Sequence, residues 1–151
     1  MRLSAKADYA IRAAAELAAA GDGHVKGERL ASAQDIPPKF LENILLDLKQ
    51  GGLIASRRGA EGGYWLARPA DEVSLADVIR AVEGPLANVR GARPEDLEYR
   101  GAAESLKQVF IAMRANLRAV LEEVTLADVA AGELPASVLA LTDDPDAWVS
   151  H

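Results

Sequence analysis

Apolar and polar positions alternate most regularly between residues 36 and 68. Apolar side chains recur there with the 3.6-residue period of an amphipathic helix, at Phe40, Leu41, Ile44, Leu45 and Leu48. The opposite face of this helix is polar and carries Lys39, Glu42, Asn43, Asp47 and Gln50. The predicted helix begins after the paired prolines 37 and 38 and ends at the glycines 51 and 52, because proline fits a first turn and glycine readily forms a left-handed cap.

Two short strand-like runs follow the double glycine, at residues 53–57 and 64–68. A glycine-rich tip, residues 59–63, joins them, so the segment predicts a β-hairpin. Arg57 and Arg58 end the first strand. Such a hairpin suits a wing that lies along a phosphate backbone or over a minor groove, although an ordinary surface hairpin can have the same pattern.

Two further helices are predicted upstream. Ser4 can cap a helix over about residues 5–20. The inward stripe of this helix is Ala10, Ile11, Ala14, Leu17 and Ala18. A short helix lies within residues 25–33, and residues 34–36 form the turn after it. A short helix, a tight turn and a longer amphipathic helix together predict a helix-turn-helix, whose second helix enters the major groove of DNA.

By that geometry, Lys39, Glu42 and Asn43 are candidates for contacts with base edges. Lysine pairs with guanine acceptors, asparagine with adenine, and glutamate with the amino group of cytosine. Lys6 and Arg12 lie on the outer side of the first helix, where each either meets a phosphate or is simply solvated. The pattern alone does not separate a recognition helix from any amphipathic surface helix.

The second half of the chain predicts three more helices. Ser74 begins a capping-box pattern, and a helix runs from it to the pair Gly84-Pro85. An aperiodic stretch, residues 86–100, predicts a mobile loop. A long helix follows over about residues 102–123. Thr125 then caps a final short helix that ends at Gly132, and a mixed, acidic tail completes the chain.

The long helix carries a stripe of large apolar residues. Its members are Leu106, Val109, Phe110, Met113, Leu117, Val120 and Leu121. The stripe either packs back on its own domain or forms a two-fold dimer interface. A small winged domain leaves little else to cover this stripe. Proteins of this kind gain specificity by pairing two DNA-binding domains, so we expect a homodimer.

Charge is distributed unevenly along the 151 residues, whose formal net charge is −6. Residues 1–69 hold ten Lys/Arg and eight Asp/Glu, whereas residues 70–151 hold seven and fifteen. The front half is therefore mildly basic and the rear half is strongly acidic. This division is compatible with a protein that presents one face to phosphate and keeps the other away from it.

The chain contains no cysteine and only two histidines, His24 and His151. Disulfides, thiol nucleophiles and cysteine-ligated clusters are thereby excluded, and the histidines are poorly placed for a metal or catalytic site. An enzyme is therefore not expected. No apolar run is long enough for a membrane span, and the charged N-terminus does not fit a signal peptide, so the predicted location is cytoplasmic.

Four segments together resemble the Rrf-two family of bacterial transcription regulators, which includes the IscR-like and NsrR-like proteins. They are MRLSAKADYAIRA, IPPKFLENILLDLKQGGLIASRRGAEGGYWLARP, VSLADVIRAVEGPL and VTLADV, and the similarity spans about residues 1–132. The resemblance implies a homodimeric winged helix-turn-helix protein that binds a pseudo-palindromic operator on double-stranded DNA. By position, the family's DNA-contacting roles fall on Ser4, Lys6, Tyr9, Lys39, Phe40, Glu42, Asn43, Arg57, Arg58 and Gly59.

The sequence departs from the family in two places. Many members sense iron, nitric oxide or redox state through a cluster held by three cysteines in the loop before the long helix. Here that loop has none of them, and Asp8, which resembles a non-cysteine ligand of some members, is expected to be a surface residue. The wing tip has Ala60 and Glu61 where the family often has Pro-Gly, and a carboxylate there should weaken attraction to phosphate.

The sequence thus predicts a mainly α fold with a small β-hairpin wing and a long dimerisation helix. The expected division is a DNA-binding domain at 1–84, a loop and dimerisation helices at 85–132, and a tail at 133–151. The expected function is a transcriptional regulator, most simply a repressor, with no cofactor and with a small molecule or a partner protein as effector. The alternative is a protein-interaction module on the same fold that has lost DNA binding.

Overall fold

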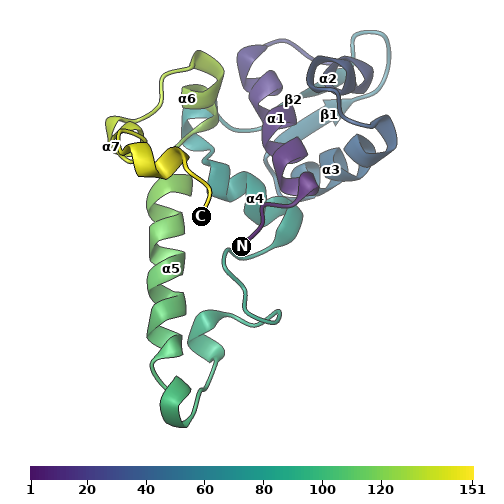
Figure 1. Ribbon diagram of the computed structural model, residues 1–151. Coiled ribbons are helices and arrows are strands. Elements are labelled where there is room, and N and C mark those ends of the chain that lie inside the picture. The colour runs from purple at the N-terminus through teal and green to yellow at the C-terminus, as the bar shows by residue number, and fades with distance from the viewer.

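The computed structural model describes residues 1–151 and is mainly helical, with one β-hairpin (Figure 1). This confirms the predicted fold class. The helices and strands are α1 (Ala5–Ala19), α2 (Gly27–Gln34), α3 (Pro38–Gln50), β1 (Ile54–Arg57), β2 (Gly63–Leu66), α4 (Leu75–Glu83), α5 (Leu106–Leu121), α6 (Leu126–Ala131) and α7 (Ala136–Ala140). No helix is both long and apolar enough to cross a membrane.

Helix α1 runs through the centre of the core. Ser4 caps it by accepting a hydrogen bond from the Ala7 amide at 3.0 Å. The buried face of α1 consists of Ala7, Ala10, Ala13, Ala14 and Leu17. Most of this face is alanine, whose small side chain lets α2, α3, α4 and α6 approach closely. The predicted members Ile11 and Ala18 are only partly buried, at the margin of the core.

The turn between α2 and α3 depends on a left-handed residue. Asp35 has φ 51°, and the next amide, of Ile36, donates to the Ala31 carbonyl at 2.9 Å. Ile36 is then buried, and Pro37 and Pro38 start α3. Four of the five predicted stripe residues of α3 are buried, but the assignment of Phe40 to this stripe is wrong. Phe40 is 44% exposed, because it lies at the first turn of α3, where its ring meets Tyr9 at the outer edge of α1.

Glycines at the wing tip are required by close backbone contacts. Strands β1 and β2 are antiparallel, with Ile54 opposite Leu66. Gly63 has φ 136°, and a Cβ there would lie 2.8 Å from the Val25 carbonyl oxygen. The close approach exists because Val25 and Tyr64 exchange backbone hydrogen bonds of 2.9 and 2.8 Å. The segment before α2 thereby adds one bridge to β2 and fixes the hairpin close to the wing tip.

Helix α6 returns to the core after the long helix. Its N-terminus has a capping box of Thr125 and Asp128, which matches the capping box that begins α4. The backbones of the two caps pair, and the Leu126 amide donates to the Val73 carbonyl at 2.9 Å. The Leu126 side chain is fully buried in the main core. The division of the chain at residues 84 and 132 stays a prediction, and α6 lies with the helices of the first predicted domain.

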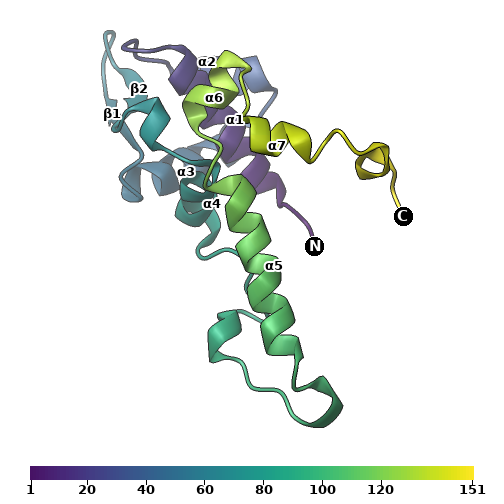
Figure 2. The ribbon, with the colours of Figure 1, turned by 90° about the vertical axis from the view of Figure 1, so that its left-hand side faces the viewer.

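Helix α5 projects from the core as a long arm (Figures 1 and 2). It begins later than predicted, because residues 101–103 form a separate 3-10 turn. The stretch before it is irregular, as expected, but Leu86, Pro94 and Leu97 are buried and attach it to the rest of the chain. The tail, predicted to be mixed, contains the short helix α7, and the residues after α7 extend away from the body in Figure 2.

The burial of α6 leads to a stability prediction. Leu126→Ala should lower the free energy of unfolding of the winged core by about 2–5 kcal/mol, because it leaves a cavity where α6 packs against α1 and the segment before α4. The control is Leu139→Ala on α7, where the side chain is 46% exposed and the expected change is below about 0.5 kcal/mol. Urea denaturation followed by circular dichroism measures both. Equal effects of the two substitutions would show that α6 is not part of the core.

Candidate nucleic-acid interface

The outer face of α3 presents free polar side chains. Lys39, Glu42 and Asn43 are all exposed, and none of them makes an ion pair or a side-chain hydrogen bond within the chain. They lie in the first two turns of the helix, on the side opposite Leu41 and Ile44, which are buried. Their donors and acceptors are therefore available to a partner.

The wing places two arginines beside this face. Arg57 and Arg58 are exposed, and Arg57 makes only one long hydrogen bond, 3.4 Å to the Glu61 carbonyl. Arg58 has no partner in the chain, and Gly59 follows it with φ 105°. The charged groups of the predicted wing residues are therefore on the surface and not in the core.

A groove of about 350 Å³ joins the helix to the wing. It is lined by Lys26, Gly27, Glu28, Pro38, Leu41, Glu42, Leu45, Arg57, Arg58, Gly59, Gly63 and Tyr64. Four of the predicted DNA-contacting residues share this surface. Sequence reasoning did not select Lys26, whose ammonium group donates to the Gly59 carbonyl at 2.5 Å. Only the folding of the wing onto the start of α2 brings these two residues together.

The wing tip is also held from its other side. The His24 ring stacks on Trp65 with ring centroids 4.2 Å apart. Its Nδ1 lies 3.0 Å from the Glu61 carbonyl oxygen. The Glu61 backbone is therefore tied to His24, whereas its carboxylate is exposed and makes no ion pair.

The residues predicted to lie near the DNA backbone in α1 are occupied within the chain. Ser4 caps the helix and also donates to the carboxylate of Glu83. The Lys6 ammonium forms an ion pair of 2.6 Å with Asp47 of α3. Tyr9 packs edge-on against Phe40, with ring centroids 5.6 Å apart. Lys6 and Tyr9 thus contact α3, whereas Ser4 contacts the end of α4. The contact of all three with DNA stays a prediction.

Arg12 braces the turn of the helix-turn-helix. Its Nη1 donates to the Gln34 carbonyl at 2.7 Å, and its Nη2 forms an ion pair of 2.8 Å with Asp8. Its guanidinium also lies 4.7 Å from the centre of the Tyr9 ring. Arg12 is thus paired within the chain, although about a third of its side chain, 33%, remains exposed. Asp8 is a surface residue, as predicted, and its partner is Arg12.

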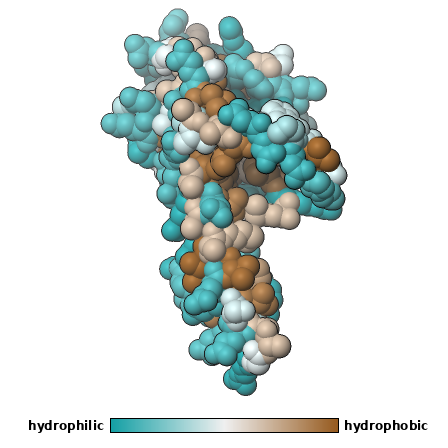
Figure 3. All heavy atoms as spheres, turned by 60° about the vertical axis from the view of Figure 1, so that its left-hand side comes forward, coloured by the Kyte–Doolittle hydropathy of each residue, from teal (hydrophilic) through white to brown (hydrophobic).

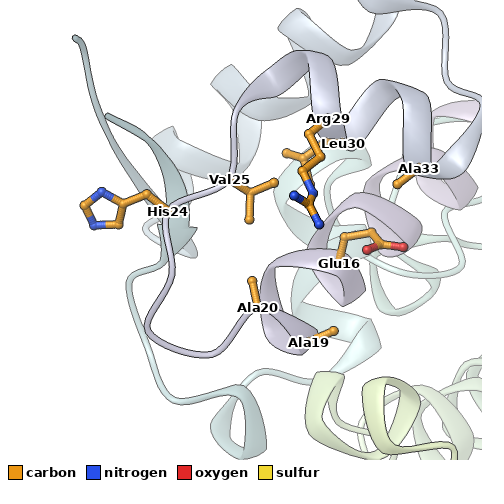
Figure 4. A pocket seen from close by; sticks show the side chains of 8 residues that line it. All are labelled: Glu16, Ala19, Ala20, His24, Val25, Arg29, Leu30 and Ala33. Carbon is orange, nitrogen blue, oxygen red and sulfur yellow. The ribbon is translucent and has the colours of Figure 1, made fainter. Parts of the chain in front are cut away.

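A second groove, of about 380 Å³, lies between α1 and α2 (Figure 4). Glu16 and Arg29 come to it from the two helices, and His24 points away from it in Figure 4. The rest of the lining is Ala19, Ala20, Val25, Leu30 and Ala33. The carboxylate of Glu16, which belongs to α1, already accepts a hydrogen bond from the Gln34 side chain.

The sequence comparisons agree with this geometry. Residues 3–132 match the profile of the family described as Rrf2, iron-dependent transcriptional regulator. The chain is also 54% identical over 145 residues to the candidate HTH-type transcriptional regulator Rv1287 of Mycobacterium tuberculosis, a match that covers 95% of this chain and 90% of that protein. The chain belongs to the Rrf2 family.

Solved structures of Rrf2-family regulators have the same fold. CymR of Bacillus subtilis, described as its global cysteine regulator, superposes with a TM-score of 0.73 and 30% identity over 87% of this chain and 98% of that chain. IscR of T. potens superposes with a TM-score of 0.69 and 28% identity over 100% of this chain and 93% of that chain. This chain is therefore a DNA-binding transcriptional regulator, and its relatives are regulators rather than enzymes.

The description of the Rrf2 family as iron-dependent raises the question of a metal site. The chain has no cysteine, and no group of three His, Asp or Glu side chains is placed to hold a metal ion. The loop before α5 offers arginines and carboxylates instead of thiolates. The residues present do not fit an iron–sulfur cluster, because such clusters are held mainly by cysteine thiolates.

The role of Arg12 can be tested by stability. Arg12→Met should lower the free energy of unfolding by about 1–2 kcal/mol, because it removes a charge-assisted hydrogen bond that is only partly screened by solvent. Asp8→Asn is the control: it removes only the exposed ion pair and should cost less than about 0.5 kcal/mol. Urea midpoints measure both. A loss with Asp8→Asn as large as that with Arg12→Met would refute the bracing role of the Gln34 contact.

Proposed function

We propose that the protein is a sequence-specific transcriptional regulator that binds a pseudo-palindromic operator as a homodimer and works without an iron–sulfur cluster. One observation carries this proposal. Lys39, Glu42 and Asn43 are free on α3, and Arg58 is free on the adjacent wing, whereas the neighbouring Lys6 and Arg12 are paired within the chain. Side chains that serve the fold are thus separate from those that remain available to DNA.

The free side chains divide into two roles. Lys39, Glu42 and Asn43 read base edges from the first turns of α3 in the major groove. Arg57 and Arg58 lie on the phosphate backbone or in the adjacent minor groove, and they position the protein rather than specify sequence. Phe40 adds an apolar contact at the helix start, where a thymine methyl group is the matching partner.

The long helix supports the homodimer. None of its residues is buried, although the stripe consists of large apolar side chains, and Val109 is 54% exposed. Figure 3 shows apolar surface along this arm as well as on the body of the molecule. Pairing of two such helices would cover this surface and would place two winged heads on successive half-sites. The dimerisation residues are those of the predicted stripe.

Repression is the simplest outcome of such binding, because a dimer that covers its operator excludes other proteins from the same DNA. The signal that releases it is a small molecule or a partner protein. The junction between the DNA-binding core and α5 is the natural place for it, since a change there alters the spacing of the two heads.

DNA binding is tested with fluorescence anisotropy on the upstream region of the protein's own operon. Arg58→Ala should weaken binding to all sequences and lower the slope of log affinity against log salt by about 1. Asn43→Ala should cost about 1–3 kcal/mol and relax specificity at one base pair. Arg100→Ala, an exposed arginine outside this surface, is the control and should bind as the parent does.

Two results would contradict these assignments. Parent-like affinity and specificity in both Arg58→Ala and Asn43→Ala would show that the reading residues are wrong. Affinity for DNA that does not rise as salt is lowered would reject the function and favour a protein-interaction module on the same fold.

The dimer is tested by multi-angle light scattering at micromolar concentration. Val109→Asp should convert the dimer to a monomer, because it places a charge in an apolar interface. Ala115→Asp lies on the opposite, exposed side of α5 and should leave the dimer intact. A monomeric parent protein would remove the argument built on the exposed stripe.

A further inference from the structure

A pocket of about 310 Å³ lies at the junction of α4, the following loop and α5. We call it the arginine pocket, and the side chains that define it are Arg80, Arg93, Arg114, Arg118, Glu95 and Leu86. The four arginines come from three separate parts of the chain: one from α4, one from the loop and two from α5. Their convergence is a product of the fold, because no basic run exists in the sequence.

Only one carboxylate, that of Glu95, lies among these guanidinium groups. It pairs with Arg114, whose Nη1 lies 2.5 Å from Oε2. Its backbone hydrogen bond, followed by the contact with Arg114, lowers the pKa of Glu95 below its usual value, so the group remains a carboxylate. The Arg114 side chain is only 14% exposed, and this makes it the most shielded charge of the pocket.

Carboxylates outside the pocket offset part of the remaining positive charge. Arg80 pairs with Glu122 and, at 3.7 Å, with Asp77, and Arg118 lies 3.8 Å from the same Glu122. Arg93 has no ion pair within the chain. Four guanidinium groups therefore face three carboxylates. Glu122 is shared by Arg80 and Arg118, and Asp77 also takes part in the capping box of α4.

Hydrogen-bond donors are in larger excess than charge. Each guanidinium has five N–H donors in a rigid fork that matches carboxylate, sulfate or phosphate oxygens. The contacts to Glu95, Glu122 and Asp77 use only a minority of these donors. A group of like charges around a polar cavity is stabilised by an anion that accepts several of them at once.

We propose that the arginine pocket binds a compact oxyanion with two or more negative charges and that this anion is the effector of the regulator. The volume of about 310 Å³ is at the lower limit of ordinary ligand pockets and favours a small metabolite or an inorganic oxyanion. Phosphate, sulfate and multiple carboxylates share the required chemistry. The effector role rests on the proposed function, whereas binding of the anion does not.

The position of the pocket gives the anion a route to DNA binding. A ligand that bridges Arg80, Arg93 and Arg114 joins α4 of the core to the loop and to α5. It would hold the core and the long helix in one relative orientation, which sets the distance between the two reading heads of a dimer. Glu95 occupies part of the same charge field and acts as an internal competitor for the anion.

Isothermal titration calorimetry tests binding to the intact protein, with sodium sulfate, sodium phosphate and trisodium citrate as probes and sodium chloride of equal ionic strength as the reference. At least one probe should saturate a single site per chain. Arg93→Gln should weaken it about tenfold, since it removes a charged donor that has no structural partner. Arg100→Gln, a matched change outside the pocket, should bind as the parent does. Glu95→Gln should bind more tightly, because a competing negative charge is removed.

These outcomes decide the proposal. Heats no larger than those of chloride for all three probes, or equal affinities in Arg93→Gln and Arg100→Gln, would reject the anion site. A parent-like affinity in Glu95→Gln would reject the competition. A purely structural role for these arginines would change the thermal midpoint of the variants without changing any affinity for the anion.

A second measurement separates the effector role from DNA binding itself. The saturating probe should change the affinity of the parent for its operator at least fivefold at constant ionic strength and leave that of Arg93→Gln unchanged. Anion binding without this change would reject the effector role. No DNA binding under any condition would reject the proposed function, while the calorimetric result on the pocket would stand.

Discussion

Close packing around α1 is the constraint on which the rest of the structure depends. Ala7, Ala10, Ala13 and Ala14 are at most 1% exposed, and helices from both halves of the chain meet this alanine face. Methyl side chains allow those helices to approach in a way that larger side chains would prevent. The orientation of α3, and with it the direction of its free polar face, follows from this packing. The wing is then fixed by the backbone bridge between Val25 and Tyr64.

Polar contacts at the edge of α1 complete the support of the reading helix. The Lys6–Asp47 pair holds the last turns of α3 from the side, and Arg12 holds the turn before α3 through a backbone carbonyl. Partly exposed ion pairs contribute little stability individually, so their importance here is geometric. They fix the position of a helix whose outward side chains have no partner in the chain. This division explains how a chain with negative net charge can still present an open face to DNA.

Helix α5 has the reverse properties of α1. Its stripe consists of large apolar side chains, none of them buried, whereas α1 buries small ones. The two helices are linked through α4, and the arginine pocket lies where α4 and α5 meet. In the proposed mechanism, a ligand at this junction changes how α5 is held relative to the DNA-binding core. The converging guanidinium groups at this junction are the basis of the proposed anion site.

The sequence by itself determined the local elements, because their signals are local. Periodicity predicted α3, the capping-box residues Ser74 and Thr125 predicted the starts of α4 and α6, and the glycines around Gly63 predicted the hairpin. It also identified the free polar residues of α3 and the wing, since these are set by which face of one helix and one hairpin is polar. The apolar periodicity of α3 could not separate Phe40, in the first turn, from the buried stripe. Spacing along one helix does not show how far the neighbouring helix extends to cover it.

Only the tertiary structure decided which lysine and arginine side chains have partners within the chain. The sequence left Lys6 and Arg12 as either phosphate contacts or solvated residues, whereas the structure pairs them with Asp47 and Gln34 from other elements. The return of α6 to the core and the meeting of Arg93 with α4 and α5 are likewise long-range events. Their physical reason is that burial and charge pairing depend on three-dimensional neighbours, which a pattern along one segment does not specify.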